Sequence, residues 1–279
     1  MKITSASIRW LCLITTFTFV LSVVWLNGDN GGVFGYCGET LNMTDQTQAS
    51  PMRPIPVWDL PTRIFHWALA LIVIIAYFTG DDDIPEIIIH TYLGYAVGAL
   101  LMFRVIWGLG WGVGWGLGGN RYAQFGDFIK PWSVTRDYAR QLMRFSPPKY
   151  VGHNPLGGLM IVAMIVVLAV IVVTGMGAAI DEGVRIAFLD GLPGWMADIA
   201  EDIHEGAGEL IMIMAGVHVA GVVADSVLTR DNLIKAMITG SKIHDNPNAA
   251  AAPVGAWRAL VLAGLAGAVW VWLILQTRF

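Results

Sequence analysis

Charged residues are scarce in this sequence. Only 14% of its 279 residues are Asp, Glu, Lys or Arg, whereas 56% are hydrophobic. A soluble domain would carry about a quarter charged residues. The composition therefore excludes an ordinary soluble globular protein and predicts a polytopic helical membrane protein. The 12 Trp and 32 Gly agree with this class, because Trp favours membrane interfaces and Gly is common in membrane helices.

Cysteine and the common catalytic motifs are almost missing. The two cysteines, Cys12 and Cys37, are too few for a disulfide framework and match neither a metal site nor the CxxCH motif that attaches c-type haem. The sequence has no phosphate-binding P-loop, no GxGxxG motif after a strand, no GxSxG nucleophile elbow and no HExxH zinc motif. Nothing in it predicts a nucleic-acid partner.

Beyond the N-terminal region, five apolar runs are each long enough to cross a bilayer, which requires about 20 residues of helix. They cover residues 62–80, 87–110, 155–177, 203–224 and 256–275. We expect an all-α membrane fold in which residues 56–245 form a four-helix domain and residues 246–279 supply a linker and a C-terminal transmembrane helix. Residues 1–55 are an N-terminal extension. Its apolar run 8–26 resembles a signal peptide or first anchor, but a crossing there would place the start of the first helix outside. A native start at Met43, or a segment that does not span the membrane, is therefore the preferred interpretation.

Lysine and arginine alternate from loop to loop. The loops after the second and fourth runs are basic, and those after the first and third are acidic. Because short basic loops stay in the cytoplasm, the first, third and fifth helices are predicted to start at the inner surface. The basic and aromatic segment 121–150 is expected to lie along that surface as one or two interfacial helices. The stretch 108–119, rich in Gly and Trp, is interpreted as an aromatic belt with a flexible turn.

Four of the six histidines fall in the predicted helices, at two depths. His66 lies near the inner end of the first helix, and His90 lies near the outer end of the second. The fourth helix carries His204 near its outer end and His218 fourteen residues further in. This spacing is about 21 Å along the axis and about 40° around it. His204 can therefore meet only His90, and His218 can meet only His66.

Two histidine pairs at two depths of a bundle are what two haems with bis-histidine ligation require. Glycines such as Gly94, Gly98 and Gly208 would leave room for porphyrins, although small residues also permit close helix packing. A single histidine at a helix end is often only an interfacial residue. Zinc or copper is the competing interpretation, but each site would need three or four ligands, and only the outer pair has carboxylates nearby in the sequence.

Three segments carry a family resemblance: VWDLPTRIFHW at 57–67, GNRYAQF at 119–125 and GHNPLGGLM at 152–160. Together they resemble bacterial cytochrome b-561 proteins and the b-type cytochrome subunit of nickel-iron hydrogenases, over about residues 56–242. The resemblance implies a four-helix cytochrome of the bacterial inner membrane with two haems b (protohaem IX) and with quinone or quinol as a substrate.

The same resemblance implies that four histidines are the axial ligands of the haem irons, paired as His66 with His218 and His90 with His204. Three parts of the chain depart from the family pattern. The Gly- and Trp-rich stretch is longer than usual, residues 1–42 lie outside the match, and the last helix is an addition to the four-helix core.

Several other polar residues have two interpretations each. Arg63 and Arg104 could pair with a haem propionate or serve as positive-inside anchors. His153 could exchange a proton at a quinone site, but a solvated loop residue is the preferred interpretation, as for His244. Asn154, which precedes a proline, predicts a helix N-cap. Proton acceptors for quinol oxidation are expected among the outer carboxylates Glu201, Asp202, Glu205 and Glu209.

The leading functional hypothesis is a di-haem cytochrome that passes electrons between the quinone pool and a periplasmic or membrane redox partner. The acidic outer loops could steer a basic c-type cytochrome by long-range attraction. The first alternative is a haem-bearing membrane anchor of a hydrogenase or dehydrogenase complex, and the second is a haem-free transporter. The sequence assigns no catalytic residue. It leaves open a homodimer and a place in a quinol-dependent oxidoreductase.

Overall fold

Five long helices dominate the fold. The computed structural model describes residues 52–80, 84–110, 116–181 and 183–279. The long helices are α2 (Leu60–Phe78), α3 (Ile84–Leu109), α6 (Pro155–Asp181), α7 (Gly194–Thr229) and α9 (Ala256–Gln276). Each is long and apolar enough to cross a membrane, which confirms the predicted all-α, polytopic fold. The expectations for the run 8–26, for a start at Met43 and for residues 111–115 fall outside the described residues.

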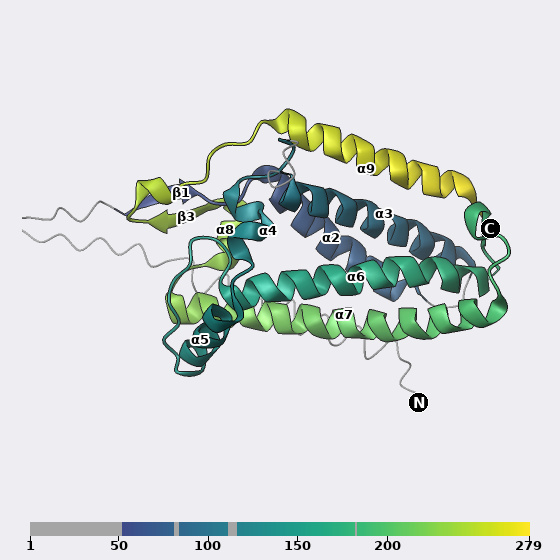
Figure 1. Cartoon of the computed structure of the whole chain (residues 1–279), viewed down its shortest axis with the longest axis horizontal. Coiled ribbons are helices and arrows are strands. Elements are labelled where there is room, and N and C mark those ends of the chain that lie inside the picture. Colours follow the sequence, from purple (N-terminus) through teal and green to yellow (C-terminus); the bar gives the residue numbers. More distant parts are fainter. Residues whose placement is uncertain (1–51, 81–83, 111–115, 182) are drawn as a thin grey trace, which may run out of the picture.

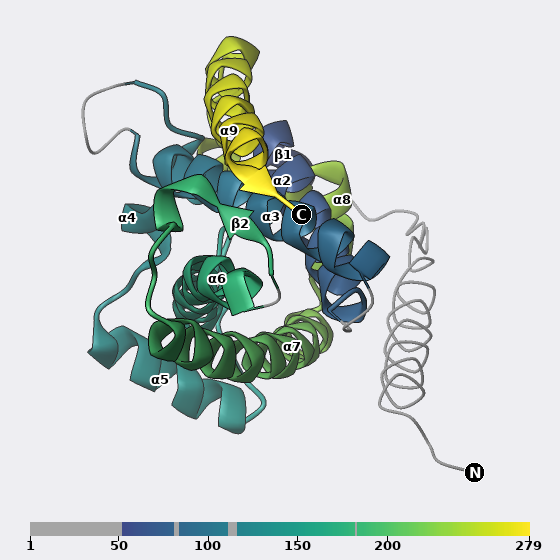
Figure 2. The ribbon, with the colours of Figure 1, turned by 90° about the vertical axis from the view of Figure 1, so that its right-hand side faces the viewer.

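The four-helix core consists of two helix pairs, with α9 added on one side. α6 packs along α7, α2 packs along α3, and α3 also contacts α6. α9 lies against α3, on the outside of the core (Figures 1 and 2). Within the described residues, α2 and α7 make no comparably close backbone contact. They meet through side chains, as where the Tyr77 hydroxyl lies 3.0 Å from Oε1 of Glu209.

Short elements cover the two ends of the bundle (Figure 1). At the end that the charge pattern predicts to face inward are β1 (Arg53–Pro56), η1 (Arg121–Ala123), α4 (Phe125–Phe128), α5 (Trp132–Met143), α8 (Leu233–Thr239), β3 (Ser241–His244) and η3 (Pro247–Ala249). At the outer end are β2 (Arg185–Ile186), η2 (Ala187–Leu189) and β4 (Thr277–Arg278). Two antiparallel ladders, β1 with β3 and β2 with β4, tie sequence-distant segments together.

α7 is longer than the predicted helix 203–224. It has 36 residues, about 54 Å at 1.5 Å per residue, whereas the hydrocarbon core is about 30 Å thick. The extra turns at its start carry Asp198, Glu201 and Asp202, which a search for apolar runs passes over. The helix begins after Pro193 and ends at Arg230, whose φ of 56° is left-handed.

The expected linker after β3 is packed against the domain. Ala249 and Ala251 are buried beside Ile55 and Val57, and the Ala251 amide donates to the Pro56 carbonyl over 2.8 Å. The four-helix domain was expected to begin at residue 56, which is the last residue of strand β1. This strand is paired with β3, so residues before the expected boundary also pack against the domain. Ladder hydrogen bonds of this kind depend on distant partners and leave no periodic signal in so short a strand.

Asp59 holds the inner ends of α2 and α3 together. Its Oδ1 accepts from the Thr62 amide over 2.8 Å, capping α2, and from Nε1 of Trp107 over 3.3 Å. Its Oδ2 accepts from the Asn120 amide over 2.9 Å. A Cβ at Gly119 would lie 2.2 Å from Nε1 of Trp107, so only glycine lets the chain pass this indole.

The carboxylate of Asp225 docks α5 onto the bundle. Asp225 is buried near the inner end of α7. It accepts from the Tyr138 hydroxyl over 2.8 Å and from Nδ2 of Asn154 over 3.1 Å. Asn154 also caps α6, because its Oδ1 accepts from the Gly157 amide over 2.7 Å, as the sequence predicted. The opposite surface of α5 exposes Trp132 and a row of arginines, and its interfacial location stays a prediction.

Replacing Tyr138 with phenylalanine is expected to loosen α5. Burial and the neighbouring Asp225 raise the pKa of Tyr138, so the hydroxyl remains a donor at ordinary pH. Without it, one oxygen of a buried carboxylate loses its partner, which costs about 1–3 kcal/mol. Thermal unfolding in detergent and the rate of tryptic cleavage within α5 would measure the change. Tyr150→Phe is the matched control, and equal behaviour of the two variants would contradict this role.

Candidate functional site

The fold brings the four helix histidines together as two pairs. His66 of α2 faces His218 of α7, with ring centroids 6.4 Å apart and ring planes at 52°. His90 of α3 faces His204 of α7, with centroids 5.7 Å apart and planes at 80°. We call these the inner pair and the outer pair. The partners are those expected from depth, and α7 contributes one histidine to each pair.

The spacing within each pair fits a metal centre held between two imidazoles. A histidine nitrogen lies roughly 2 Å from a metal ion that it ligates. Once the ring radii are added, two imidazoles on opposite sides of one metal have centroids about 6 Å apart. The two observed separations, 6.4 and 5.7 Å, fall on either side of this value. Each pair therefore has the spacing that bis-histidine ligation needs.

Backbone carbonyls orient the rings of the outer pair. Nδ1 of His90 lies 2.8 Å from the Ala76 carbonyl oxygen, and Nδ1 of His204 lies 2.9 Å from that of Ile171. Because a carbonyl only accepts, each Nδ1 must carry the proton, which leaves Nε2 with a free lone pair. Metal-ligating histidines characteristically have such a partner on the other nitrogen. In the inner pair, Nδ1 of His66 is buried with no hydrogen-bond partner among the described residues.

Glycines make room beside the outer pair. A Cβ at Gly175 of α6 would lie 2.7 Å from Cε1 of His204, so the imidazole occupies space that any side chain would fill. Gly94 and Gly208 lie one helical turn from His90 and His204, and a Cβ at either would meet none of the described residues within 4 Å. These two positions therefore leave open space beside the outer pair. Gly98 differs, because it packs against Val172 and serves helix contact.

The predicted arginines lie at the inner end of the bundle. Nη1 of Arg63 donates to the Ile238 carbonyl, while its buried Nε has no partner in the described part of the chain. Arg104 is only 4% exposed, and its guanidinium lies over the rings of Phe125 and Phe128, 4.9 and 5.7 Å from their centroids. The positive-inside interpretation alone does not explain why Arg104 is buried, since an anchor would be expected in contact with headgroups.

His153 is not the solvated loop residue that was preferred from the sequence. Its ring packs between Trp58 and Phe128, with centroids 4.5 and 4.9 Å away. Burial, followed by the charge of Arg104, lowers the pKa of His153 to about 3, so the ring is neutral. The interpretation failed because both aromatic partners are distant in sequence. His244 is more exposed, and its Nδ1 accepts from the Asn246 amide over 2.9 Å.

Most of the outer carboxylates lie on the exposed surface of α7. Asp202, Glu205 and Glu209 are exposed on α7, and Glu209 is partnered by Tyr77. Within the described ranges, no three His, Cys, Asp or Glu side chains converge as a metal site would require. The described residues therefore offer no ligand set for the zinc or copper alternative.

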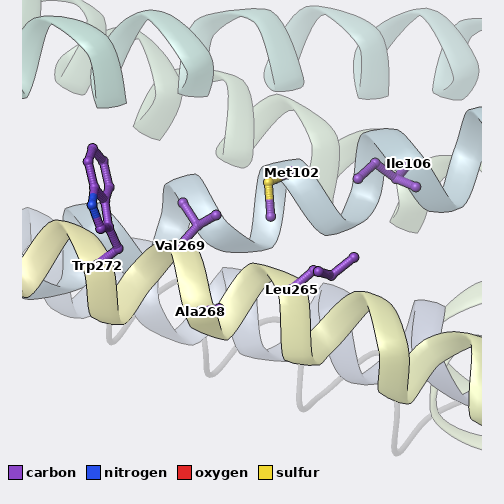
Figure 3. A pocket seen from close by; sticks show the side chains of 6 residues that line it. All are labelled: Met102, Ile106, Leu265, Ala268, Val269 and Trp272. Carbon is purple, nitrogen blue, oxygen red and sulfur yellow. The ribbon is translucent and has the colours of Figure 1, made fainter.

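An apolar groove between α3 and α9 is separate from the histidines (Figure 3). It has a volume of about 430 Å³ and is lined by Met102, Ile106, Leu265, Ala268, Val269 and Trp272. These side chains offer almost no polar group, so the groove has no chemistry of its own. Its position between two membrane helices is one where hydrocarbon chains of the bilayer would pack.

Comparisons with known proteins identify a family. The family model described as prokaryotic cytochrome b561 matches residues 57–240. A probable Ni/Fe-hydrogenase B-type cytochrome subunit of Azotobacter vinelandii is 28% identical over 240 residues, which are 73% of this chain and 95% of that protein. The protein of the same name from Rhizobium leguminosarum bv. viciae is 27% identical over 228 residues, 70% and 92% of the two chains. No solved structure matches.

The family resemblance of the three sequence segments is thereby confirmed, as is the expectation of a multi-pass membrane protein of electron transfer that carries haem b. The family match spans α2 to α8 and includes all four paired histidines. It ends before α9, in keeping with the position of α9 outside the four-helix core. The chain belongs to the prokaryotic cytochrome b561 family.

Proposed function

We propose that this chain is a di-haem electron-transfer subunit. In this proposal His66 and His218 hold one haem b near the inner surface, and His90 and His204 hold a second near the outer surface. The observation that carries it is the pairing itself, with centroid separations of 6.4 and 5.7 Å at two depths of one bundle. A bis-histidine haem supplies reversible one-electron transfer at its iron.

The protein's own contribution is to hold and orient these rings. The carbonyls of Ala76 and Ile171 keep Nε2 of the outer histidines available for ligation. The shared helix α7 fixes the distance between the two levels, because both of its histidines are on one rigid element. Arg63 lies one turn from His66, and its buried Nε has no hydrogen-bond partner among the described residues, which supports a contact with a propionate.

For the partners, we propose quinone or quinol in the membrane and a hydrogenase on the outer side. The hydrogenase is favoured over a c-type cytochrome because the relatives are probable Ni/Fe-hydrogenase B-type cytochrome subunits. The expected location is the bacterial inner membrane. Exposed carboxylates on the outer part of α7, such as Asp202 and Glu205, offer a charged docking surface for a hydrogenase or for a c-type cytochrome.

A reduced-minus-oxidised visible spectrum with a haem count tests the proposal. The purified full chain is expected to show two b haems per polypeptide, and reduction by added quinol would identify the membrane partner. Purification from native membranes under mild detergent would show whether hydrogenase subunits accompany it. A colourless protein would contradict the proposal and favour the transporter alternative.

Gly175→Ala is expected to weaken the outer site selectively. The new Cβ would lie 2.7 Å from Cε1 and 2.8 Å from Nδ1 of His204, so the ring must move and lose its bond to the Ile171 carbonyl. Loss of such an orienting partner typically weakens metal affinity 10- to 100-fold. Gly264→Ala on α9, where a Cβ meets no described residue within 4 Å, is the control. Equal haem content and spectra in both variants would contradict the assignment.

A further inference from the structure

The guanidinium of Arg104 is buried and has no ion-pair partner among the described residues. Arg104 is 4% exposed, and its Nη1 has no hydrogen-bond partner in the described part of the chain. Asp59 is the acidic residue whose charge acts on it, but the Asp59 oxygens accept from Thr62 and Asn120 and form no ion pair with Arg104 among the described residues. A buried charge without a partner is strongly unfavourable. A bound anion beside the Arg104 guanidinium would offset this cost.

The position of Arg104 relates it to the inner pair. It follows His90 on α3 by fourteen residues, the same separation as between His204 and His218 on α7. Fourteen residues advance about 21 Å and leave a rotation of about 40°. Because α3 and α7 both run from the outer end to the inner end and meet at His90 and His204, Arg104 is expected at the depth of His218, on the face of α3 that carries His90.

His153 adds a second unpartnered nitrogen to the same region. Its Nδ1 is buried with no hydrogen-bond partner among the described residues. Its ring shares Phe128 with the Arg104 guanidinium, and Arg104, His218 and His66 all act electrostatically on it. Because His153 is neutral, it can donate one hydrogen bond without adding a second charge to the site.

We propose that Arg104 and His153 bind a carboxylate group of the haem held by the inner pair. This inference rests on the proposed function. A carboxylate supplies both the negative charge that the guanidinium lacks and acceptors for two N–H groups. A quinone carbonyl would accept a hydrogen bond but is neutral, so it would leave the charge uncompensated. A phospholipid phosphate shares the anionic chemistry and must be separated by experiment.

The first test compares Arg104→Gln with Arg104→Lys and the control Arg140→Gln. Arg140 is exposed on α5 at the same end. We expect Arg104→Gln to accelerate transfer of the inner haem to apomyoglobin by about tenfold or more, the effect of losing one hydrogen bond to a charged group. In Arg104→Gln the midpoint potential of the inner haem should fall, because a positive charge beside it is lost. The potential should also depend on pH, because the haem carboxylate is no longer held in its ionised form. Arg104→Lys should lie between, and Arg140→Gln should match the wild type.

The second test changes the haem and uses both the wild type and Arg104→Gln. The full-length apoprotein is reconstituted with protohaem or with its dimethyl ester, which has no free carboxylate. The ester is expected to weaken retention more in the wild type than in Arg104→Gln, where only the carboxylate contact of Arg63 is left to lose. Equal additional weakening by the ester in both proteins, or unchanged haem retention in Arg104→Gln, overturns the inference. If Arg104→Gln instead loses bound phospholipid while its haem is unaffected, the anion is a lipid phosphate.

Failure of this inference is distinguishable from failure of the proposed function. If His66→Ala and His218→Ala lose the inner haem while Arg104→Gln retains it normally, the haem assignment stands and the carboxylate site is wrong. If the histidine variants retain both haems, the proposed function itself is wrong.

Discussion

His218→Ala is expected to remove the haem nearer the inner surface and to leave the outer one in place. His218 faces His66 with a centroid separation of 6.4 Å, so its removal leaves the inner site with only one of the two imidazoles proposed to hold the haem. The haem-to-protein ratio, measured by pyridine haemochrome, should fall to half. The remaining reduced-minus-oxidised spectrum should be that of the outer site alone.

Because the histidines act in pairs, the pairing also predicts which variants lose the same haem. His66→Ala should give the same residual spectrum as His218→Ala, and the double variant should lose nothing more, because residues that act as one unit are not additive. His90→Ala and His204→Ala should both give the complementary spectrum. His244→Ala, a partly exposed histidine in β3 at the inner end, is the control. If His90→Ala and His218→Ala removed the same haem, the depth assignment would be wrong.

The membrane helices were predictable because each crossing needs its own run of apolar residues. α2, α3, α6 and α9 lie within a few residues of the predicted spans, except that α6 extends to Asp181. The histidine partners could be expected for a related reason. Depth in a bilayer is set by position along a helix, so one coordinate read from the sequence was enough to pair His90 with His204.

Features that depend on contacts across the fold were not predictable. The sandwich of His153 between Trp58 and Phe128 joins residues from three separate segments. The role of Asp225 as acceptor for Tyr138 was likewise not predictable from the sequence. A carboxylate in a helix expected to span the membrane does indicate that a polar partner exists, but it does not identify that partner. Sequence periodicity identifies the face of a helix, but it does not identify the residue on another element that meets that face.

The dependence of both sites on α7 has a structural consequence. α7 packs along α6 throughout, whereas it meets α2 mainly through side chains. A haem held between α7 and either α2 or α3 would therefore link the α6–α7 pair to the α2–α3 pair, which protein contacts alone connect only in part. Haem binding is expected to stabilise the bundle by mass action, since only the folded state presents paired imidazoles.

Gly208→Leu is expected to abolish or severely weaken outer haem binding, whereas Gly206→Leu is expected to be tolerated. Gly208 lies four residues from His204, about 40° around the helix, and Gly206 lies two residues away, about 160° from it by the shorter way round. At either position a Cβ meets no described residue within 4 Å. Contacts of a Cβ with the described residues therefore do not distinguish the two positions.

A difference would have to come from a group bound between the imidazoles of the outer pair. Gly208 is partly buried, whereas Gly206 is exposed, as expected if one faces the bundle interior and the other faces lipid. Haem content and the outer-site spectrum should be lost in Gly208→Leu and retained in Gly206→Leu, while thermal unfolding of the two apoproteins should be alike. Gly94→Leu, one turn from His90, should reproduce the loss. If the two α7 variants bound haem equally, the space beside His204 and His90 would not be a porphyrin site.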